Sequence, residues 1–415
     1  MCNSCKAHSF WPQGRVLEKL YGISIYFFPR RNIRLPAGLP SRIEHHLGLV
    51  EQFEITLKCG AASLFTFVES MLGKEDLERY SRQIVLRGIG QQGQLKIKKA
   101  KVCIAGVGGL GCVSAMQLAA MGVGSIRLVD RDIVDVANLH RQHLYDVASL
   151  GYPKVEVATK KILALNPNVE VDLRTLSVDF DTAEKVAQGV DVVVDGLDRF
   201  ASRYAINRAC LKFEIPYVFG GAIEYYGNVS TIVPRKTACL ECFLGKVTDE
   251  RLPTCENVGV LASVVGVVAS IQVREALSIV LGTTPSLANR LMFCDLDSMM
   301  FETFPVARRD ECPACSTYKE VPTVSEGVRV AELCGKNAFI VTPKRQFSVD
   351  LERAMESLVS KFKVKIRSQL GITFDYSSDI SISLMRTGNM LIKGVNTQEE
   401  ALRIYDQIAS MFKNR

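Results

Sequence analysis

The 415-residue sequence predicts an α/β fold with a doubly wound, mostly parallel sheet and a smaller α+β module at its C-terminal end. Three observations predict this fold. An apolar run at 102–105 is followed at once by the glycine turn GVGGLG and then by a helical stretch. Short strand and helix candidates alternate from there to residue 220, which is typical of parallel strands with helices on both faces. Beyond residue 321 the pattern changes to two helices and several short strands.

The predicted elements of the larger part follow a regular order along the chain. Strands are expected at 102–105, 125–129, 169–173, 191–195, 216–220, 228–233 and, as a pair, within 291–304. Helices are expected at 75–83, 110–121, 153–166, 181–188, 202–212 and 258–281. We therefore expect a nucleotide-binding domain over 71–320, preceded by a poorly ordered leader over 1–70.

The remaining residues, 321–415, predict a small partner-binding module of the α+β class. Its strands are expected at 339–341, 364–367, 372–375, 380–385 and 389–393, and its helices at 349–362 and 397–412. The run ISISLM at 380–385 alternates strictly, which predicts a strand buried on one side only.

Composition limits the classes of function. The formal net charge of +7 comes without a dense basic run, so charge does not argue for binding to nucleic acid or to a membrane surface. No stretch qualifies as a transmembrane helix, because the most apolar one contains Gln272 and is better explained as a buried helix. Thirteen cysteines, no visible secretory signal and three C-x-x-C pairs indicate reduced thiols and metal ligands in the cytosol.

Two C-x-x-C pairs lie seventy residues apart in the second half of the chain. Four thiolates can close a tetrahedral zinc site with no open position, so we expect a structural zinc ion rather than a redox dithiol. The predicted ligands are Cys239, Cys242, Cys312 and Cys315.

The glycine turn predicts a nucleotide site. Glycines let a phosphate approach backbone N–H groups at a helix N-terminus, where the helix dipole favours negative charge. The glycines concerned are Gly106, Gly108, Gly109 and Gly111. Asp130 ends the second strand and can accept a hydrogen bond from a ribose hydroxyl. Alone, this fingerprint would indicate NAD or FAD.

The polar residues that follow exceed what a dehydrogenase needs. They are Asp132, Asn138, Arg141, Gln142 and Lys154. Two cations and an amide near phosphates suit a triphosphate that is cleaved, because charge develops on the leaving pyrophosphate. Asp198 follows the strand VDVVVDG, at the sheet edge where such folds bind ligands, and its carboxylate can hold Mg²⁺.

Together, these motifs resemble the ThiF/MoeB superfamily, the adenylating core of ubiquitin-activating enzymes. The resemblance rests on ERYSRQIVLRG, GVGGLG, LVDRDIVDVANLHRQ, GYPK, DGLDRFASR and the paired C-x-x-C, over about residues 75–318. It implies that MgATP adenylates the C-terminal glycine of a ubiquitin-fold protein ending in Gly-Gly. Asp130 would then hold the ribose, Asn138, Arg141 and Lys154 the phosphates, and Asp198 the magnesium. Arg82 would reach into the active site of the other subunit of a homodimer.

The fate of the adenylate depends on the segment RLPTCENVG. It resembles the cysteine segment of the family, in which Cys255 can attack the adenylate and form a thioester for transfer to a conjugating enzyme. In sulfur-carrier relatives the matching cysteine serves sulfur transfer, and a spectator thiol is a further alternative. Nothing in the sequence resembles the active loop of a rhodanese domain, which favours the thioester route or simple adenylation.

Three alternatives remain at this point. The first is a MoeB- or ThiF-like activator of a sulfur carrier that serves molybdopterin, thiamine or tRNA thiolation. The second is a NAD-dependent oxidoreductase, which would explain the glycines but not Arg82, Arg141, Lys154 and Asp198 together. The third is a non-catalytic scaffold with a degenerate ATP site. By analogy, the C-terminal module would recruit the modifier or a conjugating enzyme.

Overall fold

The computed structural model describes residues 27–28, 54–55, 72–249, 257–316, 327–333, 337–343 and 347–413. By its contacts the chain divides into one unit of residues 1–79 and a second of residues 80–415. In the first unit, β1 (Phe27–Phe28) pairs antiparallel with β2 (Glu54–Ile55), and α4 spans Lys74–Arg79. The leader predicted over 1–70 otherwise lies outside the described residues.

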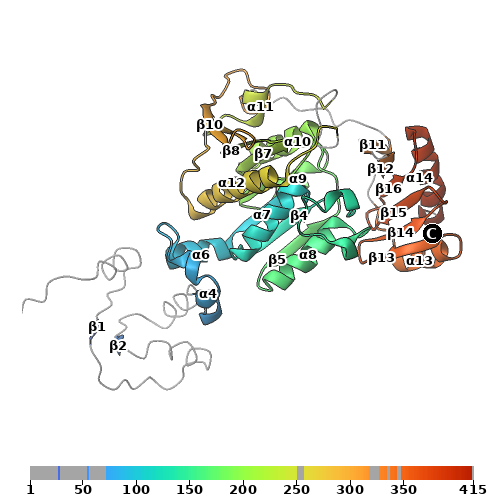
Figure 1. The fold of residues 1–415 in the computed structure, drawn as a ribbon, viewed down its shortest axis with the longest axis horizontal. Helices are drawn as coiled ribbons and strands as arrows, with labels where there is room; N and C mark the ends of the chain where they lie inside the picture. The colour runs from blue at the N-terminus through green and yellow to red at the C-terminus, as the bar shows by residue number, and fades with distance from the viewer. Residues whose placement is uncertain are drawn as a thin grey trace, which may run out of the picture. The chain divides into compact units, whose positions relative to one another are not determined.

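An eight-stranded sheet forms the centre of the second unit (Figure 1), in the order β10-β9-β8-β7-β6-β3-β4-β5. The strands are β3 (Lys101–Ala105), β4 (Ser125–Val129), β5 (Glu170–Arg174), β6 (Val192–Asp195), β7 (Tyr217–Ile223), β8 (Tyr226–Ile232), β9 (Arg290–Asp295) and β10 (Met300–Pro305). Strands β5, β4, β3, β6 and β7 are parallel to one another, whereas β8, β9 and β10 extend the sheet from β7 in antiparallel fashion. The mostly parallel sheet predicted from the sequence is confirmed.

Helices cover both faces of this sheet. The helices of this unit are α5 (Ser81–Ile84), α6 (Gly90–Lys99), α7 (Gly109–Ala120), α8 (Lys154–Leu165), α9 (Ala183–Ala187), α10 (Phe200–Lys212), α11 (Leu240–Leu244) and α12 (Ala262–Leu281). Alternate residues of β3 serve the two faces: Val102 and Ile104 pack with α7, α8 and α12, whereas Cys103 and Ala105 pack with α9 and α10. The sheet is therefore doubly wound, with one hydrophobic core on each face.

Helix α12 begins four residues later than the sequence predicts and passes through the core. By length and composition alone it could cross a membrane, so the expectation that no stretch qualifies is wrong on that criterion. Such a test is also passed by core helices, and 56% of the most apolar window of α12 is buried within the protein. Its fully buried Gln272 donates hydrogen bonds to the carbonyl oxygens of Asp195 and Val218. These contacts make α12 a core helix of the sheet.

The C-terminal module contains a six-stranded antiparallel sheet in the order β11-β12-β16-β15-β14-β13. Its strands are β11 (Arg329–Leu333), β12 (Ala338–Thr342), β13 (Lys363–Arg367), β14 (Gly371–Asp375), β15 (Ser381–Met385) and β16 (Met390–Lys393). Helices α13 (Leu351–Val359) and α14 (Gln398–Lys413) pack on one face. The predicted α+β class is confirmed, although β11 was not anticipated.

One prediction about this module is wrong. Strand β15 was expected to be buried on one side only, but Ile382, Ser383, Leu384 and Met385 are all buried. Ile382 and Leu384 face the helices, whereas Met385 packs with Ile133 of the nucleotide-binding domain. The alternation correctly separates the two faces of β15, but the nucleotide-binding domain covers the face that was expected to be exposed.

Candidate nucleotide site and candidate metal centre

The turn between β3 and α7 requires glycine at two positions. Gly106 has φ +92°, and a Cβ there would lie 2.4 Å from the carbonyl oxygen of Gly196, which follows β6. A Cβ on Gly111 would lie 1.9 Å from the carbonyl oxygen of Gly106. These close approaches seat the first turn of α7 against the ends of β3 and β6. The N-terminus of α7, at Gly109, is thereby held at the carboxyl edge of the parallel strands, where helix dipoles favour anions.

Asp130 connects this turn to the end of β4. Its Oδ2 accepts a hydrogen bond from the N–H of Val107 at 2.8 Å, and its Oδ1 accepts one from the N–H of Asp132 at 2.8 Å. Burial raises the pKa of Asp130, while the ammonium group of Lys154 opposes that rise. The Tyr145 hydroxyl donates to the carbonyl oxygen of Val107 at 2.8 Å, so the turn is fixed from two directions.

Lys154 is the buried cation of the site. It is only 5% exposed at the start of α8, and its Nζ lies 3.0 Å from Oδ2 of Asp132. Burial alone would lower the pKa of Lys154, but the carboxylates of Asp132 and Asp130 outweigh burial and raise it. Lys154 is therefore an ammonium ion at neutral pH. Its backbone N–H also donates to the carbonyl oxygen of Asp132 at 2.9 Å, which ties the two segments together.

Asn138, Arg141 and Gln142 come from a short 3₁₀ turn, η1 (Val136–Asn138), and the residues after it. Gln142 is 3% exposed, and its Nε2 lies 3.8 Å from the position of a Cβ on Gly108. Among the described residues, its buried Oε1 has no hydrogen-bond partner. The Cδ of Arg141 lies 3.8 Å from the position of a Cβ on Gly109. The cationic side chain of Arg141 beside bare glycine backbone suits an anionic ligand. The orphaned amide oxygen of Gln142 would accept a hydrogen bond from a donor group of a ligand.

Asp198 lies at the same edge of the sheet, three positions beyond the last residue of β6, and its side chain is exposed. The buried carboxylate nearby is Asp195, which sequence reasoning missed. Asp195 accepts a hydrogen bond from Nε of Arg203 at 3.0 Å, and both side chains are buried. The motif DGLDRFASR begins at Asp195 and ends at Arg203. It contains two aspartates and two arginines, and their spacing does not predict which of them form a buried ion pair.

Two predicted catalytic residues are not brought into this cluster. Arg82 lies on α5 with an exposed side chain, and among the described residues no hydrogen bond or ion pair joins it to the cluster. This agrees with either a role in a second subunit or no role. Cys255 lies outside the described residues, so its position stays a prediction.

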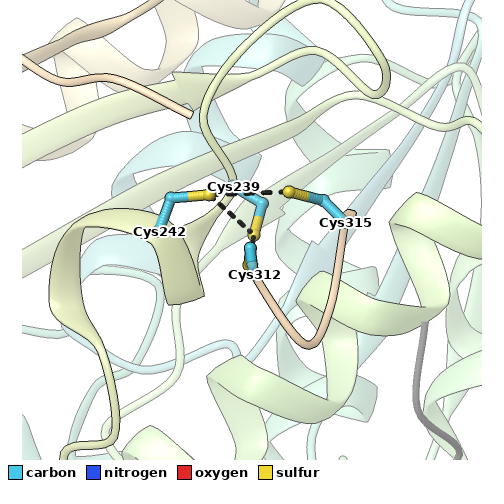
Figure 2. Close-up of side chains that lie close together, drawn as sticks. All are labelled: Cys239, Cys242, Cys312 and Cys315. Atoms are coloured by element: carbon cyan, nitrogen blue, oxygen red, sulfur yellow. Dashed lines mark hydrogen bonds between the residues drawn. The ribbon is translucent and has the colours of Figure 1, made fainter. Parts of the chain in front are cut away.

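The four predicted metal ligands do come together. Their sulfur atoms all lie within 4.8 Å of one another, and Figure 2 shows the side chains pointing towards a common centre. The Sγ–Sγ distances are 3.8 Å for Cys239–Cys242, 3.6 Å for Cys239–Cys312 and 3.5 Å for Cys242–Cys315. A tetrahedral ion with bonds of about 2.3 Å would place sulfurs roughly 3.8 Å apart. The cluster therefore has the donor set and spacing of a site that could bind zinc.

The surroundings of the cluster also suit a metal. Burial raises the pKa of the Cys239 thiol, so a cation is needed for that sulfur to ionise readily. The backbone N–H of Arg309 donates to Sγ of Cys242 at 3.5 Å. Outside the cluster, four further cysteines are buried within the two hydrophobic cores of the sheet: Cys103, Cys112, Cys210 and Cys294.

Comparison with known proteins identifies the family. Residues 80–314 match the model of the ThiF family, and the chain belongs to that family. It is 35% identical over 268 residues to the Adenylyltransferase and sulfurtransferase MOCS3 of Anopheles gambiae, covering 64% of this chain and 60% of that protein. It is 37% identical over 245 residues to the SAMP-activating enzyme E1 of Haloferax volcanii, covering 59% of this chain and 90% of that protein. The chain thus spans about three fifths of the length of the MOCS3 relative.

A solved structure supports the fold assignment. The crystal structure of E. coli MccB with ATP is 26% identical and superimposes with a TM-score of 0.52, covering 63% of this chain and 83% of that chain. The resemblance to the ThiF/MoeB superfamily and the α/β fold class predicted from the sequence are both confirmed.

Proposed function

We propose that this protein is an ATP-dependent activating enzyme that adenylates the C-terminal glycine of a ubiquitin-like modifier or sulfur carrier ending in Gly-Gly. The observation that carries the proposal is the meeting of the glycine turn, Asp130, Gln142 and the buried ammonium of Lys154 at one edge of the sheet. The names of the two relatives, an adenylyltransferase and an activating enzyme E1, support the same activity.

The charged residues of the site and the start of α7 have proposed roles, as does Asn138. Backbone N–H groups at the start of α7 face the phosphates, and Asp130 accepts a hydrogen bond from the ribose. Lys154, Arg141 and Asn138 bind the phosphates, where the two cations offset the charge that develops on the leaving group. Asp132 keeps Lys154 charged and oriented through their 3.0 Å ion pair.

The proposed reaction is an in-line displacement at phosphorus. An oxygen of the carrier's terminal carboxylate attacks the α-phosphorus of ATP, the bond from that phosphorus to the bridging oxygen breaks, and pyrophosphate leaves. No general base is needed, because the attacking carboxylate is already ionised at neutral pH. The protein's contribution is positioning and charge stabilisation. Magnesium, when bound, would neutralise phosphate charge, and the exposed carboxylate of Asp198 suits it as an oxygen ligand.

We propose that the adenylate then passes to Cys255. Its thiolate would attack the carbonyl carbon, the bond from that carbon to the AMP oxygen would break, and a thioester would form with release of AMP. The C-terminal module would dock the carrier or a conjugating enzyme. The alternative outcome is sulfur-carrier activation without conjugation, which the name of the MOCS3 relative favours.

ATP–pyrophosphate exchange with candidate Gly-Gly-ended small proteins tests the proposal. Exchange that depends on the intact Gly-Gly tail is expected, whereas NAD binding without exchange for any carrier would overturn the assignment. Cys255→Ala separates the two routes. A thiol-sensitive adduct lost in this variant, with exchange retained, supports the thioester. An unchanged adduct would exclude Cys255 as its site.

The assembly and location follow from the same proposal. We expect a homodimer in which Arg82 of one subunit serves the site of the other. The many free cysteines suit a reducing compartment, so we place the enzyme in the cytosol.

A further inference from the structure

The second face of the module's sheet is packed against the nucleotide-binding domain. Ile133, between Asp132 and the η1 turn, forms a buried cluster with four residues of the module: Ala338, Ile340, Met385 and Leu391. These four lie on β12, β15 and β16. The module therefore covers the segment that leads from β4 to Asn138, which is part of the candidate nucleotide site.

The same face contacts the strand-like segment that precedes Lys154. The backbone N–H of Gly151 donates to the carbonyl oxygen of Val134 at 2.9 Å. Further along the same two segments, the N–H of Lys154 donates to the carbonyl oxygen of Asp132 at 2.9 Å. On the module's side, the Thr373 hydroxyl donates to the carbonyl oxygen of Gly151 at 3.1 Å. Gly151 has φ +81°, and a Cβ there would lie 2.3 Å from Cδ1 of Ile366. The module thus supports both segments that carry the Lys154–Asp132 ion pair.

One contact reaches from the module into the η1 turn itself. The ammonium of Lys393, at the end of β16, lies 2.6 Å from Oδ2 of Asp135. The other oxygen of Asp135 accepts a hydrogen bond from the N–H of Ala137 at 3.1 Å. In return, Oδ1 of Asn138 accepts one from the N–H of Asp135 at 3.2 Å, which completes a capping box. Lys393, Asp135 and Asn138 therefore form a continuous chain of contacts.

We propose that Lys393 is a positioning residue for ATP: by holding Asp135, it fixes the η1 turn so that Asn138 faces the phosphates. This rests on the proposed function, because it assigns Asn138 to the phosphates. The physical reason is that a 3₁₀ turn of three residues has little stability of its own and depends on its caps. A charge-assisted hydrogen bond from Lys393 to the capping carboxylate of Asp135 is stronger than a neutral one, so it reduces the number of conformations open to the turn.

A second ion pair in the same interface provides a matched control. Arg329 on β11 lies 2.9 Å from Asp179 and 2.8 Å from Asp181, in the segment before α9. The side chain of Arg329 is 30% exposed and that of Lys393 is 29% exposed. Both residues tie the module to the nucleotide-binding domain, but only Lys393 contacts the turn that carries Asn138. Loss of Arg329 should therefore weaken docking without loosening η1.

The test compares Lys393→Met, Lys393→Arg and Arg329→Met in the full chain. Hydrogen–deuterium exchange of the peptide covering 135–142, measured without ATP, reports on the turn directly. The KM for ATP in pyrophosphate exchange reports on the site. For Lys393→Met we expect faster deuterium uptake over 135–142 and a KM for ATP raised by about fivefold to tenfold, the size of one lost hydrogen bond that solvent partly screens. Arg329→Met should leave both unchanged, and Lys393→Arg should restore both largely.

Two outcomes would overturn the inference. One is normal deuterium uptake over 135–142 in Lys393→Met together with a normal KM for ATP. The other is an equal change in Lys393→Met and Arg329→Met, because this would show that module docking in general, and not the Asp135 contact, sets the turn. Absence of pyrophosphate exchange in the unmodified protein would count against the proposed function. Deuterium uptake and ATP binding measured by calorimetry would still decide the role of Lys393.

Discussion

The Nζ of Lys154 lies 3.0 Å from Oδ2 of Asp132, at a position where the lysine is almost completely buried. This ion pair holds a charged ammonium group close to Asp130, the carboxylate that bonds to the glycine turn, before any nucleotide arrives. Preorganised charge of this kind is effective because it needs no reorganisation when charge develops in the transition state. The relationship also makes Lys154 the most informative single residue to change.

Lys154→Met should reduce the rate of ATP–pyrophosphate exchange at saturating carrier by roughly 10²–10³-fold, because the leaving pyrophosphate loses its buried cation. Lys161→Met is the matched control on the same helix, since Lys161 makes an exposed ion pair with Asp146 at 2.8 Å. The control should exchange at the normal rate. Circular dichroism of both variants checks folding, and a folded Lys154→Met variant with normal exchange would remove Lys154 from the mechanism.

Removal of the metal should destabilise the protein without a direct effect on chemistry. Metal analysis of the purified protein should give about one zinc per chain, and Cys312→Ser should lose it, because a closed structural site needs all four ligands. Chelation should lower the Tm by roughly 10 °C or more. Cys210→Ala changes a buried cysteine outside the cluster and should retain the metal. Full zinc content in Cys312→Ser would contradict the assigned ligand set.

Gly111→Ala should abolish nucleotide binding, because its methyl group would lie 1.9 Å from the carbonyl oxygen of Gly106 and displace α7 from the turn. Gly266→Ala, within α12, is the control: a Cβ there meets nothing within 4 Å. The control should be slightly stabilised, by about 0.5–1 kcal/mol, since alanine favours a helix interior over glycine. ATP titration by calorimetry and thermal unfolding measure the two effects. Normal ATP affinity in Gly111→Ala would show that the turn does not carry the nucleotide.

Mixing two inactive variants tests whether Arg82 acts across a dimer. Arg82→Ala and Asp198→Ala should each lack exchange activity, for different reasons. If Arg82 serves the partner's site, co-refolding or subunit exchange should restore about a quarter of normal activity, because half of the dimers carry one complete site. If Arg82 acts within its own chain, the mixture should stay inactive.

The sheet and the clustering of several candidate site residues could be predicted because local signals agreed with tertiary structure. The apolar run at 102–105, the glycines and the acid at 130 are consecutive features of one strand–turn–helix–strand unit, so short-range patterns suffice. The cysteine pairs were equally accessible, because two pairs of soft ligands have few other uses in a chain of this kind. These predictions needed only spacing along the chain.

Other features depended on contacts between distant segments. The Asp195–Arg203 pair is internal because β6 and α10 are both covered by neighbouring elements, and sequence spacing does not reveal that burial. The alternation in β15 correctly separated its two faces, but Ser383 is buried because its hydroxyl bonds to Thr373 at 2.8 Å under the covering domain. The polar side chain of Ser383 therefore predicted an exposed position, whereas in the structure this side chain is buried and hydrogen-bonded.

The cysteine cluster also constrains the order of events during synthesis. Cys239 and Cys312 are 73 positions apart, and α12, β9 and β10 all lie between them. Because synthesis proceeds from the N-terminus, Cys239 and Cys242 are available well before Cys312 and Cys315 have been made. A metal ion can be captured with full affinity only after these three elements have emerged and brought the second pair alongside the first. Metal binding would then report that the domain is complete. A chain terminated before Cys312 would retain the glycine turn and Lys154 but would lack two of the four metal ligands.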